Sequence, residues 1–160
     1  MSLSLAGDGT ITGIDADASD LVSALGGIGS NVVSTETNTN TTTTSNTFVN
    51  TSCAATITPT SASSKILVLV SIAALRVDGT GRQLFVGLYR GDVTGTQLMD
   101  EVATTVSGAG SVQAPGQAMY LDSPATTSST TYTIALRSSV SGQSVQINDD
   151  QIMTLIEVAA

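Results

Sequence analysis

Residues 47–72 contain the feature that most constrains the fold, a predicted strand that is apolar on both faces. The segment has the pattern of a strand, a polar turn around Pro59, and a second strand from Lys65 onward. In that second strand Leu67 and Leu69 alternate with a second apolar set, which comprises Ile66, Val68, Val70 and Ile72. Because successive side chains of a strand point to opposite faces, neither face can lie in water. We therefore expect one face to cover the core of the domain and the other to pack on a second sheet or a subunit.

Segments of strand character recur about every ten residues from residue 47 onward, separated by turn clusters rich in glycine and aspartate. The predicted strands are 47–58, 65–77, 83–90, 97–106, 112–121, 130–138, 143–148 and 151–159. Strands at this spacing predict an all-β domain over residues 47–160, an antiparallel β-sandwich or jelly roll. The last strand is apolar on both faces as well, since Met153 and Leu155 alternate with Ile152, Ile156 and Val158. We therefore expect self-association, and the predicted contact residues are Leu67, Leu69, Met153 and Leu155.

Residues 1–30 have a different composition and too few apolar residues to form a core of their own. Asp17 or Ser19 could cap a short helix from residue 15 that Gly26 could end. We interpret the segment as an extended arm that docks on a partner through its apolar residues, which are Leu3, Leu5, Ile11, Ile14, Leu21, Val22 and Leu25. Residues 31–46 are rich in threonine and asparagine and form either an extended linker or an edge strand.

Charge is scarce in this chain, and most of it is negative. Charged residues make up 11% of the sequence, and the net charge is −8. Nucleic-acid binding requires clustered lysines and arginines, which the chain lacks, so we expect no nucleic-acid partner. No apolar run approaches the ~20 residues that span a bilayer, and the N-terminus has no signal-peptide pattern. We therefore expect no membrane partner and synthesis in a host cytoplasm.

The sequence offers little catalytic chemistry. It has no histidine, which removes the usual general base and the usual zinc ligand. Asp100 and Glu101 are adjacent and would point to opposite faces of a strand. The aspartates at 15, 17 and 20, and those at 149 and 150, lack the spacing of a calcium loop. The single cysteine, Cys53, lies in an apolar run and is expected to be a buried small side chain. We expect no enzymatic activity, no cofactor and no metal site.

Several segments carry a resemblance: FVNT at residues 48–51, ITP at 57–59 and SASSKILV at 61–68. GTITGI at residues 9–14, LFVGLYRG at 84–91, LDSP at 121–124 and TTYTI at 130–134 extend it. Together they resemble virion surface proteins of tailed phages, of the cyanophage type. The resemblance implies a virion structural protein, and a homotrimer is the common state of the proteins it resembles. The scarcity of basic residues favours the outside of the particle over contact with packaged genome. A capsid decoration (cement) protein that binds the major capsid protein is the leading interpretation, and a tail fibre, head fibre or adaptor is the alternative.

Overall fold

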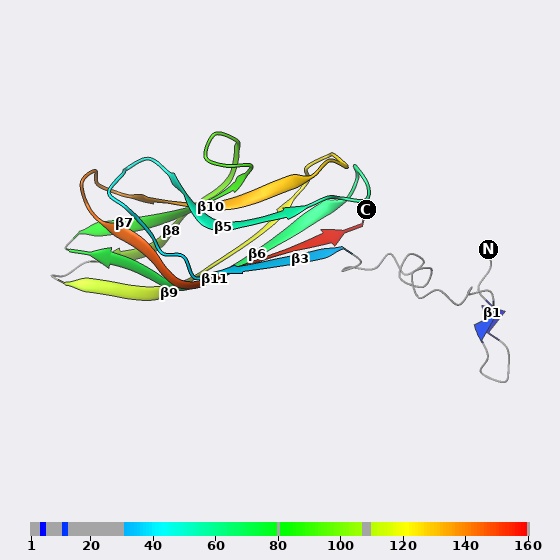
Figure 1. The fold of residues 1–160 in the computed structure, drawn as a ribbon, viewed down its shortest axis with the longest axis horizontal. Helices are drawn as coiled ribbons and strands as arrows, with labels where there is room; N and C mark the ends of the chain where they lie inside the picture. The colour runs from blue at the N-terminus through cyan, green and yellow to red at the C-terminus, as the bar shows by residue number, and fades with distance from the viewer. Residues whose placement is uncertain (1–3, 6–10, 13–30, 80, 107–109, 160) are drawn as a thin grey trace.

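The computed structural model describes residues 4–5, 11–12, 31–79, 81–106 and 110–159. Over this part of the chain the fold is all-β, with two antiparallel sheets that lie face to face (Figure 1). The four-stranded sheet has the order β5-β10-β7-β8, and these strands are Val49–Ile57, Thr130–Ser138, Arg82–Arg90 and Thr96–Val106. The five-stranded sheet has the order β3-β11-β6-β9, formed by Val32–Thr37, Val145–Val158, Lys65–Asp78 and Ser111–Asp122, and β4 (Thr41–Thr43) also pairs with β11.

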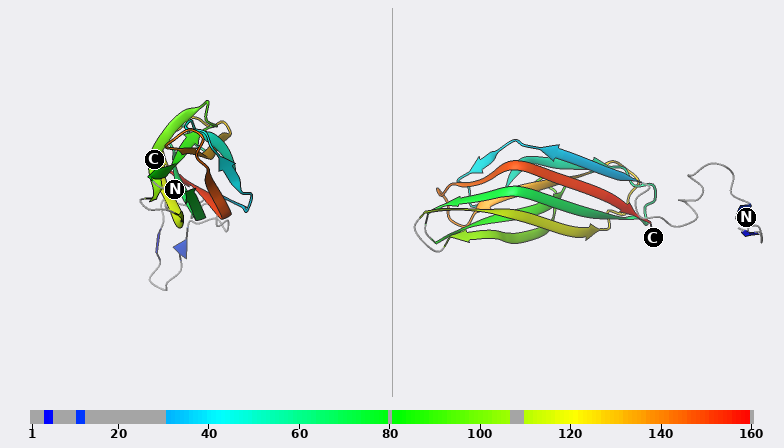
Figure 2. Two further views of the ribbon diagram at one scale, coloured as in Figure 1. Left: turned by 90° about the vertical axis from the view of Figure 1, so that its left-hand side faces the viewer. Right: turned by 90° about the horizontal axis from the view of Figure 1, so that it is seen from below.

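The strand pairing is nested. The first long strand of the sandwich, β3, pairs with the last, β11, and β5 pairs with β10. Inside these pairs, β6 pairs with β9 and β7 with β8. The right-hand view of Figure 2 shows β3, β11, β6 and β9 side by side along the long axis of the sandwich. Chain segments distant in sequence therefore share each sheet.

The core lies between the inner faces of the two sheets. Of the two apolar sets of β6, the one that faces the core is Ile66, Val68, Val70 and Ile72, which are at most 4% exposed. The four-stranded sheet contributes fully buried aliphatic side chains to the same cluster, among them Leu84, Leu88, Ile134 and Leu136. Because the side chains alternate, the residues between these positions face outward.

The all-β prediction is confirmed, and six predicted strands match β5 to β10 to within two residues at each end. The strands expected at 143–148 and 151–159 are one strand, β11, which continues through a bulge between Asn148 and Gln151. Asp149 has a positive φ of 60° there, and its backbone N–H donates to Asn40 Oδ1 at 3.0 Å. The apparent turn signal of two adjacent aspartates is therefore a bulge within a strand.

Residues 31–46 form strands of the five-stranded sheet, so the structure has the edge-strand alternative and not the linker. β3 and β4 both pair with β11, and threonine suits such half-exposed strand positions. Near the N-terminus, β1 (Ser4–Leu5) pairs with β2 (Ile11–Thr12). The helix predicted over residues 15–26 lies outside the described residues.

Candidate interaction surface on the five-stranded sheet

The outer face of the five-stranded sheet carries aliphatic side chains across all four of its long strands. The strand register places one apolar residue from each strand in a single cross-strand row: Val32, Ile156, Leu67 and Leu121. The next row along contains Leu69 and Met119 from β6 and β9, with Thr154 and Ser34 beside them. Neighbours in such rows are in contact across the sheet, so the residues form one continuous surface. We call it the outer apolar face, and it comprises Val32, Leu67, Leu69, Met119, Leu121, Ile152 and Ile156.

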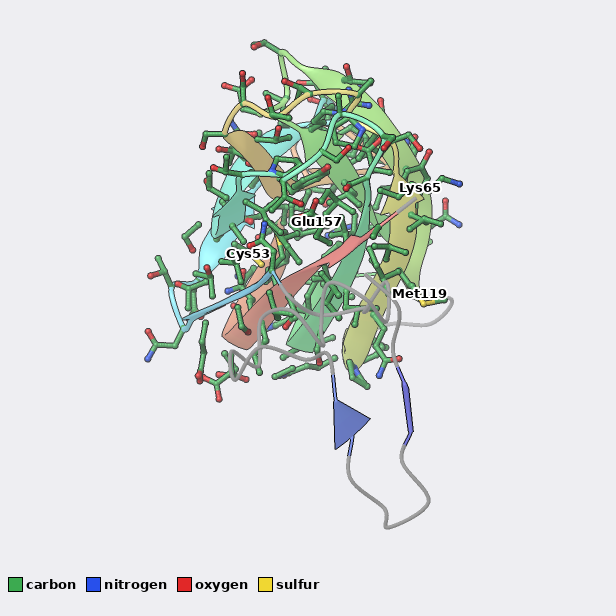
Figure 3. The ribbon with its side chains drawn as sticks, turned by 90° about the vertical axis from the view of Figure 1, so that its right-hand side faces the viewer. Cys53, Lys65, Met119 and Glu157 are labelled. Atoms are coloured by element: carbon green, nitrogen blue, oxygen red, sulfur yellow. The ribbon has the colours of Figure 1, made fainter. Side chains whose placement is uncertain are left out.

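Several members of the outer apolar face are exposed to an unusual degree for large apolar side chains. Met119 is 70% exposed, Val32 49%, Leu121 48% and Ile152 40%. Figure 3 shows Met119 projecting from the outer side of β9. A shallow hollow of about 430 Å³ lies beside it, with Leu69, Ile152 and Thr154 among its lining residues. Contiguous apolar surface of this kind is typical of an interaction site.

The predicted self-association residues fall on two different faces. Leu67 and Leu69 lie on the outer apolar face and are partly exposed. Met153 and Leu155 are fully buried in the core, so their prediction as surface contacts is corrected. Met153 pairs with Val70 and Leu155 with Val68, and cross-strand partners share a face. The outward residues of β11 are instead Ile152, Thr154, Ile156 and Val158.

The sequence is misleading at β11 because its inner face contains two polar residues. Gln151 and Glu157 flank Met153 and Leu155 at the same alternation, which suggests a face in contact with water. Both are nevertheless buried, at 0% and 3% exposure. Gln151 Nε2 donates to the backbone carbonyl of Thr39 at 3.0 Å. Met119 and Leu121 on β9 were missed as surface residues, since the run from Ala118 to Leu121 is apolar at every position.

The chain covers the outer face of the other sheet with its own side chains. Phe48 lies over Gly87, where a Cβ atom would come within 2.9 Å of the Phe48 ring. The Phe48 and Tyr89 rings meet edge to face with centroids 5.7 Å apart. The Arg137 guanidinium stacks 5.0 Å from the Phe48 centroid and 3.8 Å from that of Phe85. These side chains therefore cover the part of the outer face that lies over β7 and β10 of the four-stranded sheet.

A buried carboxylate fixes the point where the N-terminal segment joins the sandwich. Glu157 Oε1 accepts hydrogen bonds from Thr60 N at 2.8 Å and Thr60 Oγ1 at 2.7 Å, and Oε2 accepts one from Asn31 Nδ2 at 2.8 Å. Asn31 also donates to the Thr58 carbonyl, and its own carbonyl accepts from Glu157 N. In Figure 3 Glu157 lies between the layers. Burial favours a higher pKa for Glu157, but hydrogen bonds from Ser64, Thr60 and Asn31 outweigh it and lower the pKa to about 2.

A second buried carboxylate ties the two sheets together. Asp122, at the end of β9, is 4% exposed and accepts a hydrogen bond from Tyr132 Oη at 2.8 Å. Arg90 Nη2 donates to Asp122 Oδ1 at 2.9 Å, and Arg90 Nε lies 2.9 Å from Oδ2. Since Arg90 and Tyr132 belong to the four-stranded sheet, this triad links both layers at one end of the sandwich.

Of the predicted docking residues, the structure describes two. Leu5 in β1 is the register partner of Ile11 in β2. Leu3, Ile14, Leu21, Val22 and Leu25 lie outside the described residues. The docking role of all seven stays a prediction.

Cys53 on β5 and Asp100 on β8 lie on opposite edge strands of the four-stranded sheet. Cys53 is 1% exposed, as predicted, and burial raises the pKa of its thiol to about 11. Asp100 lies 3.4 Å from Arg137 in an ion pair. Across residues 31–79, 81–106 and 110–159, no three His, Cys, Asp or Glu side chains gather in a metal-binding arrangement. No helix in the described part of the chain is long and apolar enough to cross a bilayer.

Comparisons with known proteins find likeness in structure only. No protein-family model matches the chain, and no curated protein matches its sequence. The VP2 subviral particle of infectious bursal disease virus has a TM-score of 0.44 and 9% identity, and the match covers 78% of this chain and 32% of that one. The structure of the Gx strain of the same virus matches with a TM-score of 0.40 and 12% identity, and the match covers 81% of this chain and 36% of that one. This chain thus spans about a third of these virus chains.

A disulfide-linked pilus protein of Bacillus endospore appendages is also similar, with a TM-score of 0.37 and 20% identity. That match covers 82% of this chain and 93% of the pilus chain. Likeness at these levels carries no information on function.

Proposed function

We propose that this chain is a non-enzymatic virion structural protein that decorates the outside of a capsid and stabilises it. The outer apolar face is the observation that carries the proposal. Aromatic side chains of the chain itself cover part of the outer face of the four-stranded sheet, whereas aliphatic side chains of the five-stranded sheet stay exposed. An exposed aliphatic surface of this kind is typical of a protein that assembles with other subunits. The nested pairing of eight long strands supports a jelly roll, a fold that recurs in viral capsid proteins.

In this proposal the N-terminal arm docks on the major capsid protein. Its apolar residues would bury against the lattice and link neighbouring subunits. Burial of one aliphatic side chain contributes roughly 1.5–3 kcal/mol, so a few per copy resist detachment, and several arms per assembly add avidity. The hydrogen bonds that Glu157 accepts from Asn31 and Thr60 fix residue 31, where the arm meets the sandwich. The net charge of −8 favours the outer surface over contact with packaged genome.

A tail fibre, head fibre or adaptor is the alternative. The placement of the aromatic side chains favours decoration, since a glycan-binding tip requires exposed rings. Tyr132 is fully buried, Tyr89 is 5% exposed, and Phe48 and Phe85 are occupied by Arg137. The described aromatic residues thus form no exposed stacking platform.

Copy number and rebinding to particles test the proposal. We expect quantitative mass spectrometry of purified particles to find hundreds of copies, in fixed ratio to the major capsid protein. We also expect the full chain to rebind particles that lack it and a variant without residues 1–30 to fail. A handful of copies per particle would favour the fibre, and absence from particles would overturn the virion role. A truncated chain that binds as well as the full one would contradict the docking arm.

A further inference from the structure

The outer apolar face offers a self-complementary contact. We propose that two copies of this chain pack these faces against each other about a two-fold axis. The occupant of the face is therefore a second copy, and the solution state is a dimer in place of the trimer that the sequence resemblance implies. The inference rests on the self-association that the sequence predicts, and it adds the surface and the symmetry.

The first support is that one chain has one such face. The outer face of the four-stranded sheet is occupied by Phe48, Tyr89 and Arg137, as described above. Among the described residues, the outer apolar face is thus the sheet face left without cover. An apolar patch that buries against the same patch of another copy gives an isologous contact, and such contacts close as dimers. A trimer would need two different complementary patches on each copy.

The second support is the shape of the face. Met119 projects from edge strand β9 and lines one side of the hollow of about 430 Å³, and Leu69 on β6 and Ile152 on β11 are among the other lining residues. A two-fold axis that runs along β6 places β9 of each copy over β11 of the other. Met119 of one copy then enters the hollow of its partner, and the reciprocal contact forms at the same time. Leu67 and Leu69, on β6, lie at the centre of such a contact.

The third support is size and charge. The sheet is four strands wide at about 4.8 Å spacing, and β6 has 14 residues at about 3.3 Å each, so the whole outer face of the sheet, which includes the outer apolar face and the polar rows beyond it, measures on the order of 900 Å². Each partner in a standard protein interface buries ~800 Å². The rows that contain Leu67 and Leu69 have no charged member, whereas Lys65 lies in the row before Leu67 and Glu36 lies in the row of Ile152, after Leu69. The rows of Leu67 and Leu69 therefore bury no charge in this contact, although each copy has a net charge of −8.

Sedimentation equilibrium of the full chain tests the inference, since the monomer mass is 16.1 kDa. We expect twice that mass for the wild type. For Leu121→Asp we expect the dissociation constant of the dimer to rise at least 100-fold, because each dimer would bury two unpaired carboxylates. Val140→Asp is the matched control, since Val140 is 47% exposed in a turn away from the face and Leu121 is 48% exposed. That control should remain dimeric.

Met119→Asp is the second variant and should also dissociate the dimer. Two independent variants keep the test valid if one of them fails to fold. By circular dichroism, both monomeric variants should have the same β-sheet spectrum and melting temperature as the wild type at a concentration low enough for it to be monomeric. A trimeric or monomeric wild type would overturn the inference, and so would dimers that survive both substitutions. Because the readout is mass in solution, this inference and the virion proposal can fail separately.

Discussion

Replacement of Glu157 by glutamine tests how the sandwich holds the segment that enters β3. The carboxylate accepts three hydrogen bonds from Thr60 and Asn31, and it is 3% exposed. Glutamine has nearly the same shape, but its amide nitrogen cannot accept a hydrogen bond. At least one donor then loses its partner in a buried site, which is costly.

The magnitude follows from the pKa of Glu157, which folding lowers from 4.5 to about 2. Because a tenfold change in an acid constant corresponds to about 1.4 kcal/mol, ionised Glu157 contributes about 3 kcal/mol to the free energy of unfolding at neutral pH. The pKa is lower in the folded chain, so this stability is present above pH 4.5 and is lost as the pH falls toward 2. The Glu157→Gln variant lacks this contribution at every pH, so its difference from the wild type should shrink as the pH falls.

Urea unfolding at pH 7, 5 and 3, followed by circular dichroism at one low protein concentration, measures both effects. We expect Glu157→Gln to lower the free energy of unfolding by about 2–3 kcal/mol at pH 7 and by about 1 kcal/mol at pH 3, where the pKa values leave only part of the carboxylate's contribution. Glu36→Gln is the matched control, because Glu36 is exposed on β3, and it should change stability by less than about 0.5 kcal/mol. Equal losses at pH 7 and pH 3 would refute the role of an ionised Glu157.

Three further substitutions test the packing and the link between the sheets. Leu155→Ala in the core should lower the free energy of unfolding by about 2–5 kcal/mol. Leu69→Ala on the outer apolar face should lower it far less in the dilute monomer. Urea titration measures both changes. Similar losses for both would contradict the assignment of faces. Tyr132→Phe removes the hydroxyl that donates to Asp122 and should cost about 1–3 kcal/mol by the same measurement, and an unchanged stability would exclude the triad as a link between the sheets.

Much of the sandwich could be predicted from the alternation of side chains. Residues 66–72 form a strand with two apolar faces in the sequence and in the structure, because local alternation dictates which residues share a face. Alternation cannot say which of two apolar faces is the inner one. At β11 that choice depended on Thr60, Asn31 and Thr39, which are distant in sequence and supply the hydrogen bonds for Glu157 and Gln151.

The strand register explains what else escaped prediction. The outer apolar face unites Val32, Leu67, Leu121 and Ile156, which come from four separate parts of the chain. Only strand pairing brings them into one row, and a single sequence does not encode pairing in a local pattern. For the same reason the sequence predicts a turn at Asp149, where the strand register shows a bulge within β11.

Oxidation of methionine by dilute hydrogen peroxide, read by mass spectrometry, tests the central claim that the outer apolar face is buried in an assembly. Met119 is 70% exposed and Met153 is fully buried, so one chain holds both the probe and its internal control. We predict rapid oxidation of Met119 in the dilute monomer, strong protection of Met119 in the assembled state on particles, and slow oxidation of Met153 in both. Oxidation of Met119 at the same rate in monomer and assembly would contradict the account.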